Sequence, residues 1–146
     1  MKTLKMIAAL EQLRQMRERA VDDLSRKVSG QKQLKQRYLN NIDALNDLQQ
    51  TSHSLAQNAS AMSNLARYKS NIQRVINWQQ QECALAEIKE KELQQALIKQ
   101  ACQEKSVAIV LKQQQDALAK AREAKQQKMT DAQAMQAWMR RRSGAY

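Results

Sequence analysis

Apolar residues recur every three, four or seven positions along two long stretches of the chain, residues 4–55 and 65–118. The average step is about 3.5 residues, which is typical of a narrow coiled-coil seam rather than of the broad apolar face of a globular helix. The pattern therefore predicts two long helices. The first has seam residues Leu4, Ile7, Leu10, Leu13, Val21, Leu24, Val28, Leu34, Tyr38, Ile42, Leu45, Leu48 and Leu55. The second has Leu65, Tyr68, Ile72, Ile76, Cys83, Ala86, Leu93, Leu97, Val107, Leu111 and Leu118.

Polar residues interrupt both seams. Arg17 and Gln31 fall on the first seam, and the register of the second also includes Gln79, Glu90, Gln100, Glu104 and Gln114. Such layers weaken a seam relative to continuous leucine and isoleucine. Gly30 costs about 1 kcal/mol relative to alanine inside a helix. No proline or longer polar break lies near it, so we expect the first helix to continue through it.

Residues 51–64 (TSHSLAQNASAMSN) separate the two patterns and contain seven Ser, Thr and Asn side chains, which compete with a helix for backbone hydrogen bonds. We interpret this segment as the bend of an all-α antiparallel coiled-coil hairpin that forms a single domain over residues 1–146. The predicted boundaries are a first helix at 3–57 with Thr3 as its N-cap, a bend at 58–62, and a longer second helix at 63–139. Ser60 or Ser63 is the expected N-cap of the second helix. A basic tail follows at 140–146.

Composition agrees with long helices and argues against a pocketed enzyme. The 146 residues include no Pro, no Phe, two Gly and 3% aromatic side chains, too few bulky groups for a sizeable core. The only histidine, His53, has no catalytic or metal-ligating partners near it in sequence, and Cys83 and Cys102 are expected to be reduced thiols without a metal. We expect no enzymatic activity, no cofactor and no small-molecule substrate. No signal peptide or membrane span is visible, which predicts a cytoplasmic location.

The net charge of +11 is concentrated at the two ends of the chain. Residues 1–37 carry ten basic and four acidic side chains, residues 38–111 carry seven of each, and residues 112–146 carry eight basic and three acidic. Three interpretations compete: a solvated surface, binding of nucleic acid, and docking onto an acidic protein. Apolar seam residues interleave the basic ones and no stacking aromatics accompany them, so nucleic acid ranks well below protein docking.

A hairpin makes a geometric prediction. Residues whose numbers add to about 118 should lie opposite each other, which leaves residues beyond about 116 without a partner on the first helix. In that register the acidic residues Glu82, Glu87, Glu90 and Glu92 face the basic residues Arg26, Lys27, Lys32, Lys35 and Arg37.

Two apolar groups remain open to two interpretations. Residues 107–111 (VAIVL) form either a buried layer or a partner-binding patch. Met135, Trp138 and Met139 precede Arg140, Arg141 and Arg142 and form either an interface anchor or a frayed end.

Several residues together resemble the FliJ family of flagellar type III export proteins. They are Tyr38, Ile42, Asp43 and Leu48 before the bend, Ser63, Asn64, Tyr68, Ile72 and Trp78 after it, and Met129, Asp131, Met135 and Arg140–Arg142 near the end. The resemblance covers nearly the whole chain.

The resemblance implies a cytoplasmic stalk, peripheral to the inner membrane, that inserts into and stimulates the export ATPase hexamer (FliI-like). It also implies contact with the export gate protein (FlhA-like) and escort of export chaperones. The implied ATPase-binding residues are Arg14, Arg17, Lys125, Lys128, Arg140 and Arg141. The implied gate-binding residues are Asn41, Leu45, Leu48, Val75 and Trp78. The family tends to have aromatics in the first-helix part of the gate patch, where this chain has Ala44, Leu45 and Leu48.

Three alternatives stay open on sequence alone. The chain could be a basic coiled coil that binds nucleic acid, or a structural coiled coil that dimerises through one continuous helix across residues 51–64. A stalk of the related virulence-type secretion system fits the same pattern.

Overall fold

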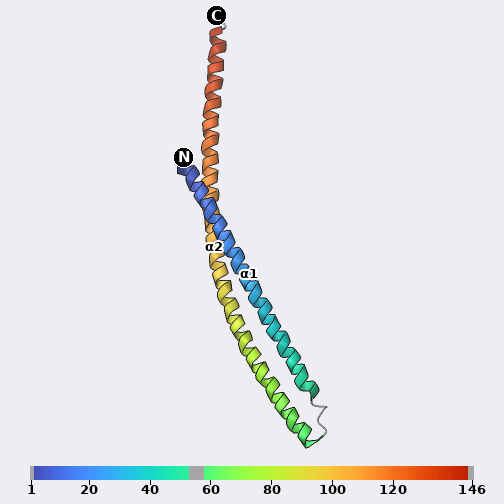
Figure 1. Ribbon diagram of the computed structural model, residues 1–146. Helices are drawn as coiled ribbons and strands as arrows, with labels where there is room; N and C mark the ends of the chain where they lie inside the picture. The colour runs from blue at the N-terminus through green and yellow to red at the C-terminus, as the bar shows by residue number, and fades with distance from the viewer. Residues whose placement is uncertain (1, 53–57, 145–146) are drawn as a thin grey trace. The chain divides into compact units, whose positions relative to one another are not determined.

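The computed structural model describes residues 2–52 and 58–144, which form two α-helices and no strand in these ranges. Helix α1 spans Lys2–Thr51 and helix α2 spans Ala59–Gly144 (Figure 1). The all-α class and the longer second helix agree with the prediction. His53, Leu55, the predicted end of the first helix at residue 57 and the last two residues of the predicted tail lie outside the described residues.

Helix α1 is continuous through Gly30, as expected. Gly30 has no positive φ, and an added Cβ at this position would meet no atom within 4 Å. The glycine therefore occupies an ordinary, open helical position. Gly30 therefore destabilises α1 through the backbone entropy that glycine loses on folding, and it does not kink the helix.

Polar side chains cap the end of α1 and the start of α2. At the end of α1, the hydroxyl of Thr51 donates to the carbonyl of Asp47 at 3.0 Å and the hydroxyl of Ser52 donates to that of Gln49 at 2.9 Å. At the start of α2, the Ala61 N–H donates to Oδ1 of Asn58 at 2.7 Å. Asn58 is therefore the N-cap, and the predicted caps Ser60 and Ser63 are wrong.

Two predicted boundaries of α2 consequently shift. Residues 59–62, assigned to the bend from the sequence, are helical because Asn58 satisfies a first-turn N–H earlier than expected. At the other end α2 continues to Gly144 through part of the predicted tail. Arginine is a strong helix former, and positive charge in the last turn interacts favourably with the helix dipole.

The chain divides into two compact units. The middle unit comprises residues 19–100, and the terminal unit comprises residues 1–18 with 101–146. In the middle unit, the Gln49 side-chain amide donates to the Lys69 carbonyl at 3.3 Å and to Gln73 Oε1 at 3.1 Å, while Lys35 pairs with Glu90. Residues earlier in α1 contact residues later in α2, so the two helices are antiparallel within this unit. The prediction that the whole chain is one coiled-coil domain stays a prediction.

The terminal unit shows the same antiparallel order. The guanidinium of Arg17 donates to Gln103 Oε1 at 2.6 Å, and the side-chain amide of Gln115 donates to Glu11 Oε1 at 3.3 Å. Beyond these contacts α2 continues past the start of α1 (Figure 1). Every described residue from 119 to 144 is exposed, as expected for an unpaired end of the longer helix.

The apolar core lies along the predicted seams. Its buried members are Ile7 and Val28 of α1 and Ile72, Ile76, Ala86 and Leu111 of α2. Four predicted seam residues are exposed instead: Leu4, Leu13, Leu48 and Tyr68. Near the bend, Gln49 and Lys69 occupy the half-buried positions beside Leu48 and Tyr68, because the register advances by four residues from Leu45 and from Leu65.

Among the acidic and basic residues that were predicted to face each other, Lys35 Nζ and Glu90 Oε2 form an ion pair at 3.7 Å. The predicted register places Lys35 opposite residue 83, seven residues before Glu90. Helical side chains tilt toward the N-terminus of their own helix. In an antiparallel pair, Lys35 and Glu90 therefore lean toward each other, and their length bridges the offset.

Candidate functional site

The basic residues assigned to ATPase binding all belong to the terminal unit, but they differ in their surroundings. Arg14 Nε lies 3.2 Å from Glu18 Oε1 and 3.6 Å from Glu104 Oε1, so two carboxylates compensate its charge. Arg17 is half-buried and donates its short hydrogen bond to Gln103. Both arginines therefore join α1 to α2 in addition to carrying charge.

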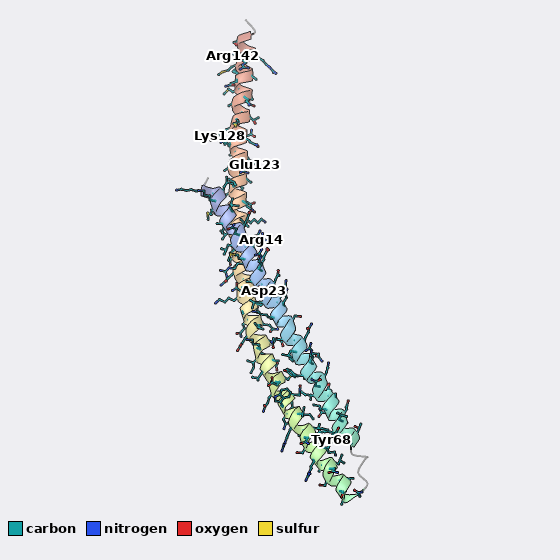
Figure 2. The ribbon with its side chains drawn as sticks, viewed as in Figure 1. Arg14, Asp23, Tyr68, Glu123, Lys128 and Arg142 are labelled. Carbon is teal, nitrogen blue, oxygen red and sulfur yellow. The ribbon has the colours of Figure 1, made fainter. Side chains whose placement is uncertain are left out.

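The other four basic residues, Lys125, Lys128, Arg140 and Arg141, are exposed on α2 alone. Figure 2 labels Lys128 on the part of α2 that lies beyond the start of α1. Lys125 follows Glu104 by 21 residues, or about 31 Å of helix rise, and Arg140 lies about 22 Å further on. The six residues therefore do not form one compact cluster but are spread along the terminal unit.

Large apolar side chains accompany the charge at this end. Met129, Met135, Trp138 and Met139 are between 55% and 58% exposed. The guanidinium of Arg142 lies 5.2 Å from the centroid of the Trp138 ring, a cation–π contact within the helix. Helical structure through Gly144 contradicts fraying up to that residue, so these side chains are presented on an ordered helix.

The residues assigned to gate binding all lie in the middle unit. Leu45 is half-buried, whereas Asn41, Leu48, Val75 and Trp78 are exposed. The hydrogen bonds of Gln49 to Lys69 and Gln73 hold this part of α1 beside α2. Because the helices are antiparallel, positions preceding Gln49 face positions following Gln73. The five residues consequently lie along the same stretch of the helix pair.

A groove of about 410 Å³ lies further along the middle unit, and sequence reasoning did not identify it. It is lined by residues of both helices, including Leu34, Tyr38, Leu85 and Ile88. Leu85 and Ile88 are 58% and 55% exposed. The sequence feature that could have identified this groove is the apolar pair Leu85 and Ile88 outside the main seam. Leu85 lies one heptad after Trp78.

Residues 107–111 have one side that is buried or half-buried and another that is exposed. Leu111 is buried at 3% exposure, and Val107 and Ala108 are half-buried, so one side forms a seam layer. Ile109 and Val110 are 51% and 39% exposed on the other side. The run is therefore a packing layer with an outward apolar pair.

Cys83 is half-buried and Cys102 is exposed, and both are free thiols. Within the described ranges 2–52 and 58–144, no group of three His, Cys, Asp or Glu side chains could hold a metal ion. No helix in these ranges combines the length and apolar character needed to cross a membrane.

Comparison with known protein families identifies a family model that matches most of the chain. The sequence model of the family described as "Flagellar FliJ protein" matches residues 6–143. Neither the curated proteins nor the solved structures yielded a significant match. The family match leaves out only five residues at the start and three at the end, and the antiparallel helices agree with the resemblance seen in the sequence. The chain therefore belongs to the flagellar FliJ protein family and is a component of the flagellar type III export apparatus.

Proposed function

We propose that this protein is the stalk of the flagellar export ATPase, inserting its terminal unit into the central hole of a FliI-like hexamer and stimulating it. The observation that carries the proposal is the exposed end of α2. Residues 119–144 are helical, are all exposed, and carry seven basic and two acidic side chains. A single helix of this kind is narrow enough to enter a ring, since its diameter is about 10 to 12 Å.

Charge explains how such an element finds its partner. A concentration of positive charge at one end accelerates encounter with an acidic protein surface and orients the approach. Lys125, Lys128, Arg140 and Arg141 make the exposed contribution to binding. Arg14 and Arg17 belong to the same proposed surface and also keep α1 attached to α2 through Glu104 and Gln103.

The middle unit provides the second part of the proposal. Trp78 and Val75 are exposed apolar residues on α2, and Leu48 is exposed on the antiparallel stretch of α1. Exposed tryptophan in an apolar patch is a frequent energetic centre of protein interfaces. In our proposal this patch contacts the FlhA-like export gate and places the protein in the cytoplasm at the inner membrane. Escort of export chaperones is part of the same proposed role and rests on family membership alone.

The ATPase proposal is tested by the steady-state ATPase activity and ring assembly of the cognate export ATPase with the purified chain. We expect the full chain to stimulate both. Truncation after residue 118 should abolish stimulation, and Lys125→Glu, Lys128→Glu, Arg140→Glu and Arg141→Glu together should reduce it about tenfold or more.

A matched control reverses the same number of charges in the middle unit. Lys27, Lys32, Arg67 and Arg74 are exposed there, and their replacement by Glu changes the net charge equally. This variant should retain most of the stimulation. If the truncated chain stimulates the ATPase as well as the full chain does, the stalk proposal is refuted.

Binding of the purified chain to the cytoplasmic part of the gate protein tests the second surface. We expect Trp78→Ala to weaken binding about tenfold or more, a common cost of removing a central aromatic anchor. ATPase stimulation should remain unchanged. Ile98→Ala is the control, because Ile98 is 64% exposed in the same unit but outside the patch. Equal losses for both variants would argue against a defined gate surface at Trp78.

A further inference from the structure

The seam of α2 follows an unusually regular register. Its positions advance by alternating steps of four and three residues, and each one is buried or half-buried. These positions are Leu65, Lys69, Ile72, Ile76, Gln79, Cys83, Ala86, Glu90, Leu93, Leu97, Gln100, Glu104, Val107, Leu111, Gln114 and Leu118. Alternation of this kind keeps one face of a helix against a neighbour, as in coiled coils.

The same register continues beyond Leu118 without a break. The next positions are Ala121, Lys125, Lys128, Ala132, Met135 and Met139, which we name the overhang seam. All six are exposed, and the two methionines are each 57% exposed. The face that packs on α1 up to Leu118 is therefore presented to solvent from Ala121 onward, still with the periodicity that suits a second helix.

The residues of the overhang seam define the chemistry of that second helix. Lys125 and Lys128 occupy two successive layers, where an apolar partner would leave two charges unpaired and a basic partner would repel them. The two carboxylates of residues 119–144, Glu123 and Asp131, lie outside the seam positions. Two overhangs from separate copies would bring four lysines together. Carboxylates are the side chains that complement these layers.

We propose that the overhang seam binds an acidic amphipathic α-helix of a partner protein. Its carboxylates pair with Lys125 and Lys128, and its apolar residues pack on Met135, Met139 and the two alanines. The proposal goes beyond insertion into an ATPase ring, because it identifies the contacting face of α2 and the secondary structure of the partner. Arg140 and Arg141 lie outside the overhang seam and are not part of this contact.

The test uses two synthetic helical peptides about four heptads long, each bearing a fluorophore. The first has leucine at its seam positions and glutamate at two successive seam layers. The second has the same composition, with those two glutamates exchanged for polar residues of its outer face. Fluorescence anisotropy measures binding of each to the full chain at about physiological ionic strength, where weak long-range attraction is screened. We expect the first peptide to bind about tenfold more tightly than the second.

Two charge variants of the chain complete the experiment. Lys125→Glu with Lys128→Glu should weaken binding of the first peptide about tenfold or more. Lys112→Glu with Lys120→Glu changes the net charge equally at exposed positions outside the seam, and should weaken binding less than about threefold. All four lysines are exposed, so circular dichroism should show folded helices in both variants.

Two results would overturn the proposal. Equal binding of the two peptides, or equal loss in the two variants, would mean that the overhang attracts any acidic molecule without using its seam. Self-association of the full chain that is abolished by Met135→Ser and Met139→Ser would mean that the seam serves a second copy instead of an acidic helix.

Discussion

At the scale of single residues, charge has two roles in this protein. Arg14 contacts Glu18 and Glu104, and Lys35 contacts Glu90, so these cations stabilise the pairing of the helices. Lys125 and Lys128 are exposed on α2. The sequence alone did not separate the cations that pair with carboxylates from those that stay exposed, because both groups lie among apolar residues. The difference comes from whether α1 is present opposite them.

Gly30 gives the clearest prediction at this scale. Replacing Gly30 with alanine should raise the free energy of unfolding by about 1 kcal/mol, because the site has helical φ and open space for the new methyl group. Urea unfolding followed by circular dichroism measures the change. Gly144→Ala is the matched control, since Gly144 ends α2 and its replacement should change stability by only a few tenths of a kcal/mol. A neutral or destabilising Gly30→Ala would contradict the open helical environment.

At the scale of elements, polar layers interrupt the seam between the two helices. Gln79 and Glu90 are 9% and 8% exposed at positions that a strong zipper would fill with leucine or isoleucine. Glu90 has Lys35 as its partner, whereas Oε1 of Gln79 accepts no hydrogen bond within the described residues. Such layers lower the stability of the helix pair and restrict the registers available to it.

Gln79→Leu tests this reading of the seam. The substitution removes a buried acceptor without a partner and adds apolar contact, so it should raise the free energy of unfolding by about 1 to 2 kcal/mol. Gln80→Leu serves as the control, because Gln80 is exposed on the same turn and its replacement should have almost no effect. Urea denaturation of the three proteins provides the comparison. Destabilisation by Gln79→Leu would show that the amide makes an essential contact.

At the scale of the whole molecule, the positive charge is concentrated toward the two ends of the chain. Residues 38–111 carry equal numbers of basic and acidic side chains, while the excess of positive charge lies before and after them. Contacts such as Arg17 with Gln103 bring residues near both ends of the chain into one unit. Antiparallel pairing thus gathers charge that is far apart in the sequence.

Pairing within one chain also predicts the mass in solution. Seam residues of α1 such as Ile7 and Val28 are buried within the single chain, so we expect a monomer of 16.8 kDa. Sedimentation equilibrium or light scattering measures this mass over a range of concentrations. A dimer of about twice that mass at every concentration would favour one continuous helix through residues 51–64, which was the alternative left open by the sequence.

Periodicity predicted most of the fold because it depends on local geometry. Ile72, Ile76 and Leu111 are buried where steps of three and four residues placed them. The same reasoning failed at Leu48 and Tyr68, where an apolar residue lies beside the seam and Gln49 or Lys69 occupies it. It also placed the N-cap at Ser60 or Ser63 instead of Asn58, because several neighbouring side chains can cap a helix equally well.

The candidate sites were predictable in part. Exposure of Val75 and Trp78 agrees with a surface patch, but the groove beside Leu34 and Leu85 requires both helices in place before it exists. Arg14 and Arg17 were assigned to a partner from their charge alone. Their contacts with Glu104 and Gln103 depend on residues more than eighty positions away, which no local pattern identifies.

Local sequence patterns predicted the two helices and most of the face that each one buries, because helix propensity and heptad spacing are properties of nearby residues. Which polar groups meet across the seam depends instead on how the two helices pack. Lys35 reaches Glu90 and not the residue opposite it, since side-chain tilt and length act between helices. The exposure of the overhang seam likewise follows from where α1 begins, and not from any change in the pattern of α2.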